Sequence, residues 1–143
     1  MNPEIINSPG SEAMEDWVRL RHNCSPYEIF LKLRAGCEED VKVRNELKEP
    51  GQQLSFRMTK NGNSFLVLRE GPRNYASIEF KWNESEITVR SEMTQNFQTY
   101  AKDSLRVTLT LTDEGDCRIK MDSQELTCAQ FRKRVLEDLL FNF

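Results

Sequence analysis

The chain has 143 residues, of which 38% are hydrophobic and 30% are charged, and 20 Lys and Arg against 23 Asp and Glu give a formal net charge of −3. At this length roughly 68% of the surface of the unfolded chain can be buried, so one domain can build its own core. The near balance of charge and the 9% aromatic content exclude an intrinsically disordered chain, and only 4 cysteines exclude a disulfide-rich scaffold.

The N-terminal segment differs in composition from the rest of the chain. It contains two prolines and a glycine but no periodic apolar positions, and we interpret residues 1–10 as a flexible leader before a single domain over 11–143. It holds neither the basic region nor the apolar run of a secretion signal, and charges interrupt every apolar stretch before it could span a bilayer. We therefore expect a cytoplasmic protein with no membrane partner.

Two helices are expected before residue 50. Ser11 is placed to cap a short helix that ends near residue 22, and Ser25, Pro26 and Glu28 are typical of a second helix start. Pro50 and Gly51 end this second segment. Its apolar positions follow a period near 3.6 and comprise Tyr27, Phe30, Leu31, Leu33, Cys37, Val41 and Leu47.

From residue 52 the apolar period changes from 3.6 to 2, which indicates strands. Asn61 and Gly62 are the residues that a type I′ hairpin turn favours at its two central positions. Such a turn would pair Met58 with Phe65 and Phe56 with Val67. All four side chains would then share one buried face.

Further strands are predicted over 75–82, 87–90, 105–111 and 117–121, whereas residues 91–103 fit neither period and are expected to form an irregular strand or a long loop. Thr127 and Gln130 form a capping box before an apolar stripe that reaches Phe143. The order predicts an α+β fold: two N-terminal helices, an antiparallel meander of about six strands, and a C-terminal helix on one sheet face.

No catalytic, metal-binding or nucleotide-binding motif occurs, so we assign no catalytic residue, no metal ligand and no cofactor. The cysteines Cys24, Cys37, Cys117 and Cys128 lack the spacing of a zinc site. If the protein were an enzyme, Cys128 would be the candidate nucleophile, because the first turn of a helix lowers a thiol pKa. The alternative for Cys128 is a small apolar residue beneath the last helix.

The outer face of the predicted sheet, opposite the buried aromatic residues, is basic. Strand alternation places six basic side chains there against two acidic ones, Glu79 and Glu86. Such a face can bind an acidic partner or another anion, or it can be ordinary solvated surface, because Arg and Lys stems cover strands well. The candidate binding residues are Arg57, Lys81, Arg90, Arg106, Arg118 and Lys120.

Three functional hypotheses follow. The first is a non-enzymatic module that binds another protein through this outer face or through a sheet edge, with a homodimer through the helical stripes or Trp17 as a variant. The order helix, sheet, helix is similar to that of small acidic secretion chaperones that dimerise and bind extended segments by strand addition. The second is a nucleic-acid or polyanion binder. Base stacking is disfavoured, because alternation places the aromatic residues Phe56, Phe65, Phe80 and Trp82 on the inner face. The third is an enzyme whose site is assembled only in the fold.

Overall fold

The computed structural model describes residues 16–143, apart from the side chains of residues 102 and 103, so the predicted leader and the Ser11 cap lie outside the described part. The predicted α+β class is confirmed. In chain order the elements are α3 (Trp17–Asn23), α4 (Pro26–Glu46), β1 (Ser55–Asn61), β2 (Ser64–Glu70), β3 (Asn74–Trp82), β4 (Ile87–Gln95), β5 (Gln98–Leu111), β6 (Cys117–Met121), β7 (Gln124–Leu126) and α5 (Cys128–Phe141).

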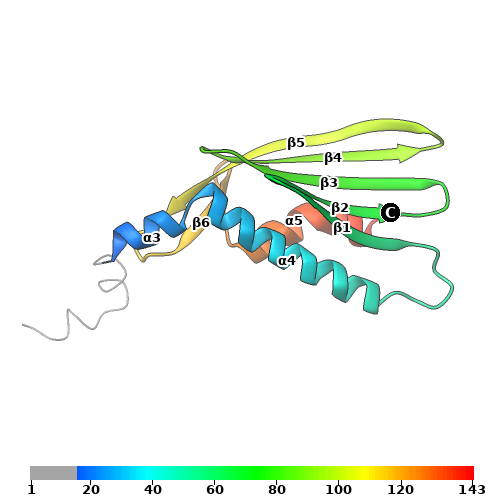
Figure 1. The fold of residues 1–143 in the computed structure, drawn as a ribbon, viewed down its shortest axis with the longest axis horizontal. Helices are drawn as coiled ribbons and strands as arrows, with labels where there is room; N and C mark the ends of the chain where they lie inside the picture. Colours follow the sequence, from blue (N-terminus) through cyan, green and yellow to red (C-terminus); the bar gives the residue numbers. More distant parts are fainter. Residues whose placement is uncertain (1–15) are drawn as a thin grey trace, which may run out of the picture.

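The strands form one antiparallel meander in which each pairs with the next, in the order β1-β2-β3-β4-β5-β6-β7. This sheet has seven strands where about six were predicted, because the three-residue β7 is too short to leave an alternating pattern in the sequence. Figure 1 shows α4 running along the sheet beside β1 and α3 extending from one end.

Helix α4 begins where the sequence predicts, because the Ser25 side chain accepts a hydrogen bond from the Glu28 backbone N–H at 3.3 Å. Gly36, in the middle of α4, lies against a side chain of α5. A Cβ at this position would lie 2.6 Å from the Arg132 guanidinium carbon, so a larger residue would force this side chain of α5 to move. Arg132 in turn donates a hydrogen bond from Nε to the Asp40 carboxylate of α4 at 2.8 Å.

The first hairpin keeps its predicted faces but not its predicted register. Gly62 and Asn63 occupy the turn, and Met58 pairs with Val67 while Phe56 pairs with Arg69. Only Gly62 has a positive φ in this turn, as a type II′ turn with glycine at its first central position requires. The turn is displaced by one residue, which moves each partner by two, so the same side chains still share a face.

Residues 91–103, expected to be irregular or a loop, form most of a long hairpin instead. Strand β4 continues to Gln95 and β5 starts at Gln98, with one bulge opposite Ser91 and Glu92 that leaves Lys102 unpaired. Asn96 and Phe97 at the turn both have positive φ. Phenylalanine at a position that normally requires glycine conceals this turn in the sequence.

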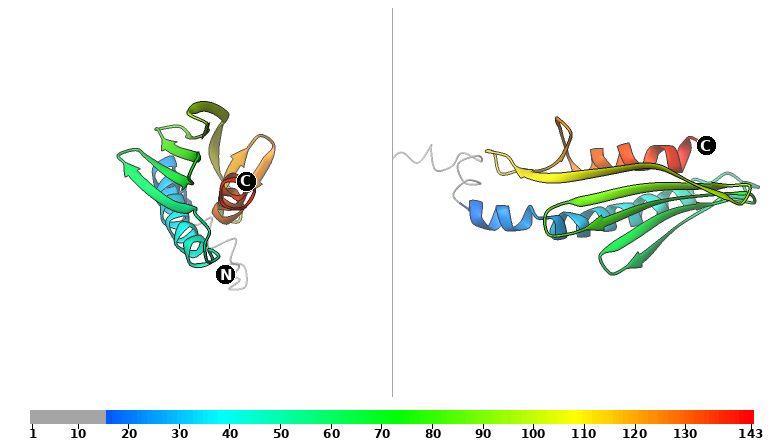
Figure 2. Two further views of the ribbon diagram at one scale, coloured as in Figure 1. Left: turned by 90° about the vertical axis from the view of Figure 1, so that its right-hand side faces the viewer. Right: turned by 90° about the horizontal axis from the view of Figure 1, so that it is seen from above.

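Both long helices pack on the inner face of the sheet. Helix α4 contacts β1, β2 and β3, whereas α5 contacts β2 and β3 as well as β6 and β7. The sheet therefore curls around α5, as the end-on view in Figure 2 shows. Between the layers lie the aromatic side chains predicted to face inward, with Phe65 and Phe80 fully buried and their ring centroids stacked at 4.6 Å.

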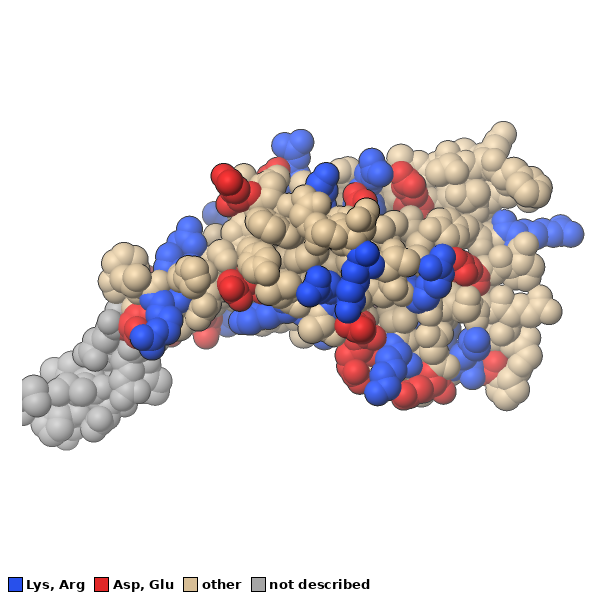
Figure 3. Space-filling model, viewed as in Figure 1, with Lys and Arg blue, Asp and Glu red and all other residues tan. Residues whose placement is uncertain are grey.

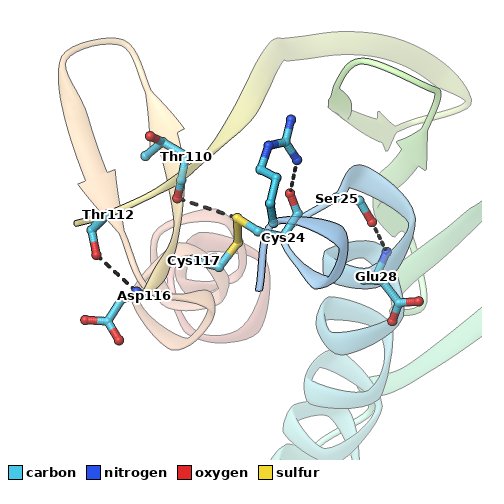
Figure 4. Close-up of a disulfide and its surroundings, with 8 residues drawn as sticks. Cys24, Ser25, Glu28, Thr110, Thr112, Asp116 and Cys117 are labelled. Atoms are coloured by element: carbon cyan, nitrogen blue, oxygen red, sulfur yellow. Dashed lines mark hydrogen bonds between the residues drawn. A yellow bond between two sulfur atoms is a disulfide. The ribbon is translucent and has the colours of Figure 1, made fainter. Parts of the chain in front are cut away.

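A disulfide joins the helical start of the chain to the far part of the sheet. Cys24, directly after α3, is bonded to Cys117 at the start of β6, across a sequence separation of 93 residues (Figure 4). No sequence feature singled out this pair, since four cysteines allow three pairings. Disulfides persist in oxidising compartments and are rare in the cytosol. The cytoplasmic location therefore stays a prediction, and this bond argues against it.

Candidate binding edge and cleft

The six predicted anion-binding residues do lie on the outer face, but on strands from β1 to β6, so they do not form one cluster. Five strand spacings of about 4.8 Å separate the first from the last, roughly 24 Å. Each of the four arginines also has a carboxylate within 4 Å. The pairs are Arg57 with Glu70 at 2.7 Å, Arg90 with Glu92 at 3.4 Å, Arg106 with Glu86 at 3.9 Å and Arg118 with Asp116 at 3.4 Å.

The charge of this outer face is lower than strand alternation suggested. Glu70 pairs with Tyr75 and Glu92 pairs with Ser77, and this register places both carboxylates on the outer face. The count of acidic residues made from the sequence included neither of them. Positive and negative side chains are likewise interspersed on the face seen in Figure 3. Arg57 also lies opposite Leu68, which is only 2% exposed on this outer side, so its stem covers apolar surface.

Most of β5 is an open sheet edge, since only four of its 14 residues pair with β6. This strand pairs with β4 over Gln98–Val107, whereas on its other side it pairs with β6 only over Thr108–Leu111. Within the described residues, no strand occupies the remaining side of Gln98–Val107. Figure 1 shows this part of β5 as the upper border of the sheet. An edge of this length presents a row of backbone groups to which another strand can bind.

The hydrogen-bond pattern shows which backbone groups point outward along β5. The Asn83 N–H donates to Glu86 O at the start of the β3–β4 pair. Because successive residues of an antiparallel strand bond to opposite neighbours, Val89 bonds toward β5 and its partner Leu105 bonds back toward β4. Ser104 and Arg106 therefore direct their N–H and C=O groups away from the sheet.

The two outermost strands are less accessible than β5. At the free side of β1, the Asn45 side chain of α4 donates to Phe56 O at 2.7 Å and accepts from Phe56 N–H at 3.2 Å. This amide occupies the groups that a neighbouring strand would use. At the other border, β7 has only three residues. The accessible edge of the sheet therefore lies on β5, although β5 is not one of the two outermost strands.

A cleft of about 560 Å³ opens beneath β5, between the inner face of the sheet and α5. Its walls are mainly apolar, with Leu105 and Met93 near the open edge and Leu139 on the helix. Volumes of this order are typical of ligand sites. The other apolar residues of the lining are Ala76, Ile78, Val89, Met121, Val135 and Phe143. The polar and charged residues of the lining are Arg69, Asn74, Ser77, Ser91, Glu92, Gln95, Ser104, Arg134, Asp138 and Asn142.

Arg69 is a charged side chain on the inner face of β2 that lines this cleft and is only 6% exposed. Its Nη1 donates to the Leu139 carbonyl at 2.8 Å, and its guanidinium carbon lies 4.4 Å from the centroid of the Phe143 ring. Burial lowers the pKa of this guanidinium. In the sequence, Arg69 stands as a charged residue within an otherwise apolar strand. The alternation pattern therefore gave no reason to select it as a site residue.

The two free thiols do not have the properties of a nucleophile. Burial is the main cause that raises the pKa of the half-buried Cys128 thiol, and Lys32 and Arg132 lower it by a smaller amount. Burial likewise raises the pKa of Cys37 to about 12. A reactive cysteine requires a lowered pKa, so this part of the enzyme hypothesis gains no support from Cys128.

Among the side chains that the structure describes, no group of three or more His, Cys, Asp or Glu is placed to hold a metal ion. No helix of residues 16–143 is long and apolar enough to cross a bilayer. Comparison with known proteins found no matching family model, no matching curated protein and no matching solved structure.

Proposed function

We propose that this protein is a non-enzymatic module that binds an extended segment of another protein by adding it as a strand along Gln98–Val107 of β5. The observation that carries this proposal is the open edge of β5, whose outward backbone groups at Ser104 and Arg106 have no strand partner among the described residues. Main-chain hydrogen bonds would supply affinity in this mode, and alternate side chains of the segment would supply specificity.

The two sides of the edge suggest which side chains the segment carries. On the inner side, Leu105 and Met93 line the mouth of the cleft, which favours apolar residues at alternate positions of the segment. On the outer side, Arg106 is 77% exposed and its closest carboxylate, that of Glu86, is 3.9 Å away. An acidic residue of the segment could therefore pair with Arg106 at a position between two apolar ones.

The outer basic face has less support as the main binding surface. Its four arginines already have carboxylate partners, and the residues that could stack on nucleic-acid bases, such as Phe65 and Phe80, are fully buried. A polyanion would have to displace these ion pairs. The β5 edge is the better candidate, because no strand of the described residues occupies its outward backbone groups.

The proposal can be tested with a single edge substitution. Ser104→Pro removes an N–H that points away from β4 and places the proline ring where an added strand must lie, while the native ladder keeps its bonds. Ser104→Ala is the matched control, because it keeps the N–H. Peptides selected from a random twelve-residue library on the wild-type protein provide the probe.

We expect the selected peptides to bind the Ser104→Ala variant as they bind the wild type and to lose at least about tenfold in affinity for Ser104→Pro. In the complex, the amides of Ser104 and Arg106 should become protected from hydrogen exchange. Equal binding to both variants would show that the edge is not the site. Sedimentation of the wild type without peptide distinguishes a second copy as the occupant, since a dimer at this edge would dissociate in Ser104→Pro.

A further inference from the structure

Among the described residues, Arg69 is the one buried charged side chain that lines the cleft beneath the sheet, and it has no oppositely charged partner there. We propose that this cleft binds a small amphipathic acid, with its carboxylate at Arg69 and its apolar chain running beneath β3 and β4 toward the opening at β5. This inference goes beyond strand addition and does not depend on it, because Arg69 on β2 is three strand spacings, roughly 14 Å, from the β5 edge.

The surroundings of Arg69 point to an anion. Its guanidinium has five N–H donors, and within the described part of the chain its one hydrogen bond goes to the Leu139 carbonyl. Among the described residues, none of the ion pairs within 4 Å includes Arg69. A buried charge without an opposite charge is costly, and a carboxylate is the partner that fits the planar guanidinium fork.

Support of the last helix does not fully explain Arg69. Arg44 binds the neighbouring carbonyl, that of Leu140, with its Nε at 2.8 Å, and it is enclosed by the rings of Phe56 and Phe141 outside this cleft. One donor from each arginine is enough to satisfy the two carbonyls at the end of α5. Arg69 differs from Arg44 because it also lines the cleft, where its remaining donors can reach a ligand.

The other charged groups of the cleft already have partners. Glu92 pairs with Arg90 at 3.4 Å, Arg134 donates to Gln124, and Asp138 accepts from Asn142 at 2.8 Å. The apolar part of the lining includes Ile78, Val89, Met93, Leu105, Val135 and Leu139. A ligand that is anionic at one end and apolar along its length matches this distribution.

Decanoate is a suitable probe, with decan-1-ol as a ligand of the same chain length without charge and acetate as a carboxylate without the chain. Titration calorimetry below the micellar concentration should give decanoate an affinity at least about tenfold higher than that of either control. In Arg69→Gln, decanoate should bind no better than decan-1-ol. Arg57→Gln, on the outer face and outside the cleft, should leave the affinity for decanoate unchanged.

Ser91→Phe gives a second test that leaves Arg69 intact, because the new ring fills the path of the apolar chain and should weaken decanoate and decan-1-ol alike. If Arg69→Gln does not fold, the Arg69 Nε–H resonance of the wild type serves instead, and it should shift with decanoate but not with decan-1-ol. Equal affinities for decanoate and decan-1-ol in the wild type would overturn the proposal. So would a preference for decanoate that persists in Arg69→Gln.

Discussion

Cys37 illustrates how one buried residue makes stability depend on pH. Its side chain is fully buried in α4, and burial first, then the nearby Asp40 carboxylate, raises its pKa from 9.0 to about 12, while Arg132 lowers it slightly. The unfolded chain therefore loses this proton near pH 9, whereas the folded protein keeps it. In this window the unfolded state binds fewer protons, so the free energy of unfolding falls as pH rises.

For this reason we expect the wild type to lose about 1.4 kcal/mol more stability than Cys37→Ala between pH 8 and pH 10. Urea unfolding at the two pH values measures the difference, and the cavity left by alanine cancels because each protein is compared with itself. An equal loss in both proteins would mean that Cys37 ionises as readily in the folded state as in the unfolded one.

Single residues also show what strand alternation can and cannot predict. Alternation placed Arg57 and Arg106 correctly on the outer face, because the side-chain period of a strand is local. Alternation did not place Glu70 and Glu92 on the same face, because Glu70 lies next to a turn and Glu92 lies in the segment without a clear period. The role of Arg69 depends on a helix 70 residues further along, which no local pattern shows.

Among the elements, the β4–β5 hairpin departs most from its sequence. Phe97 is fully exposed at its tip with a φ of 69°, in the left-handed region that favours glycine. An L residue with a side chain is strained there by about 1–2 kcal/mol. This hairpin leads directly into the open edge of β5, so its geometry positions the proposed binding strand.

We expect Phe97→Gly to be more stable than Phe97→Ala by about 1 kcal/mol, because only glycine removes the strain at this φ. The exposed ring is absent from both variants, so the comparison isolates the backbone. Chemical unfolding of the two variants provides the measurement. A stability order with alanine above glycine would show that the turn adopts another conformation in solution.

Over the whole molecule, the Cys24–Cys117 disulfide is the longest covalent constraint in the described residues. It links the junction of α3 and α4 to β6 across a sequence separation of 93, and the intervening segment includes all of β1 to β5. A cross-link over such a separation removes much of the conformational freedom of the unfolded chain, a stabilisation of about 4 kcal/mol in the loop-entropy description.

Reduction should therefore lower the urea midpoint of the wild type to that of the Cys24→Ser/Cys117→Ser variant, with a loss of about 4 kcal/mol. Dithiothreitol should have no effect on the variant, which serves as the control for the reductant itself. Should the reductant leave the wild-type midpoint where it was, the two sulfurs are not bonded in solution.

By itself the sequence determined the α+β class, the two capped long helices, the strands with clean alternation and the inward direction of Phe65 and Phe80. These features depend on local periods and on capping within four residues, so neighbouring residues suffice to specify them. Only the tertiary structure decided the register of the first hairpin, the partners of the arginines, the disulfide, the open edge of β5 and the cleft with Arg69. Each of these depends on which distant segments meet when the sheet curls around α5, and side-chain periodicity carries no information on that.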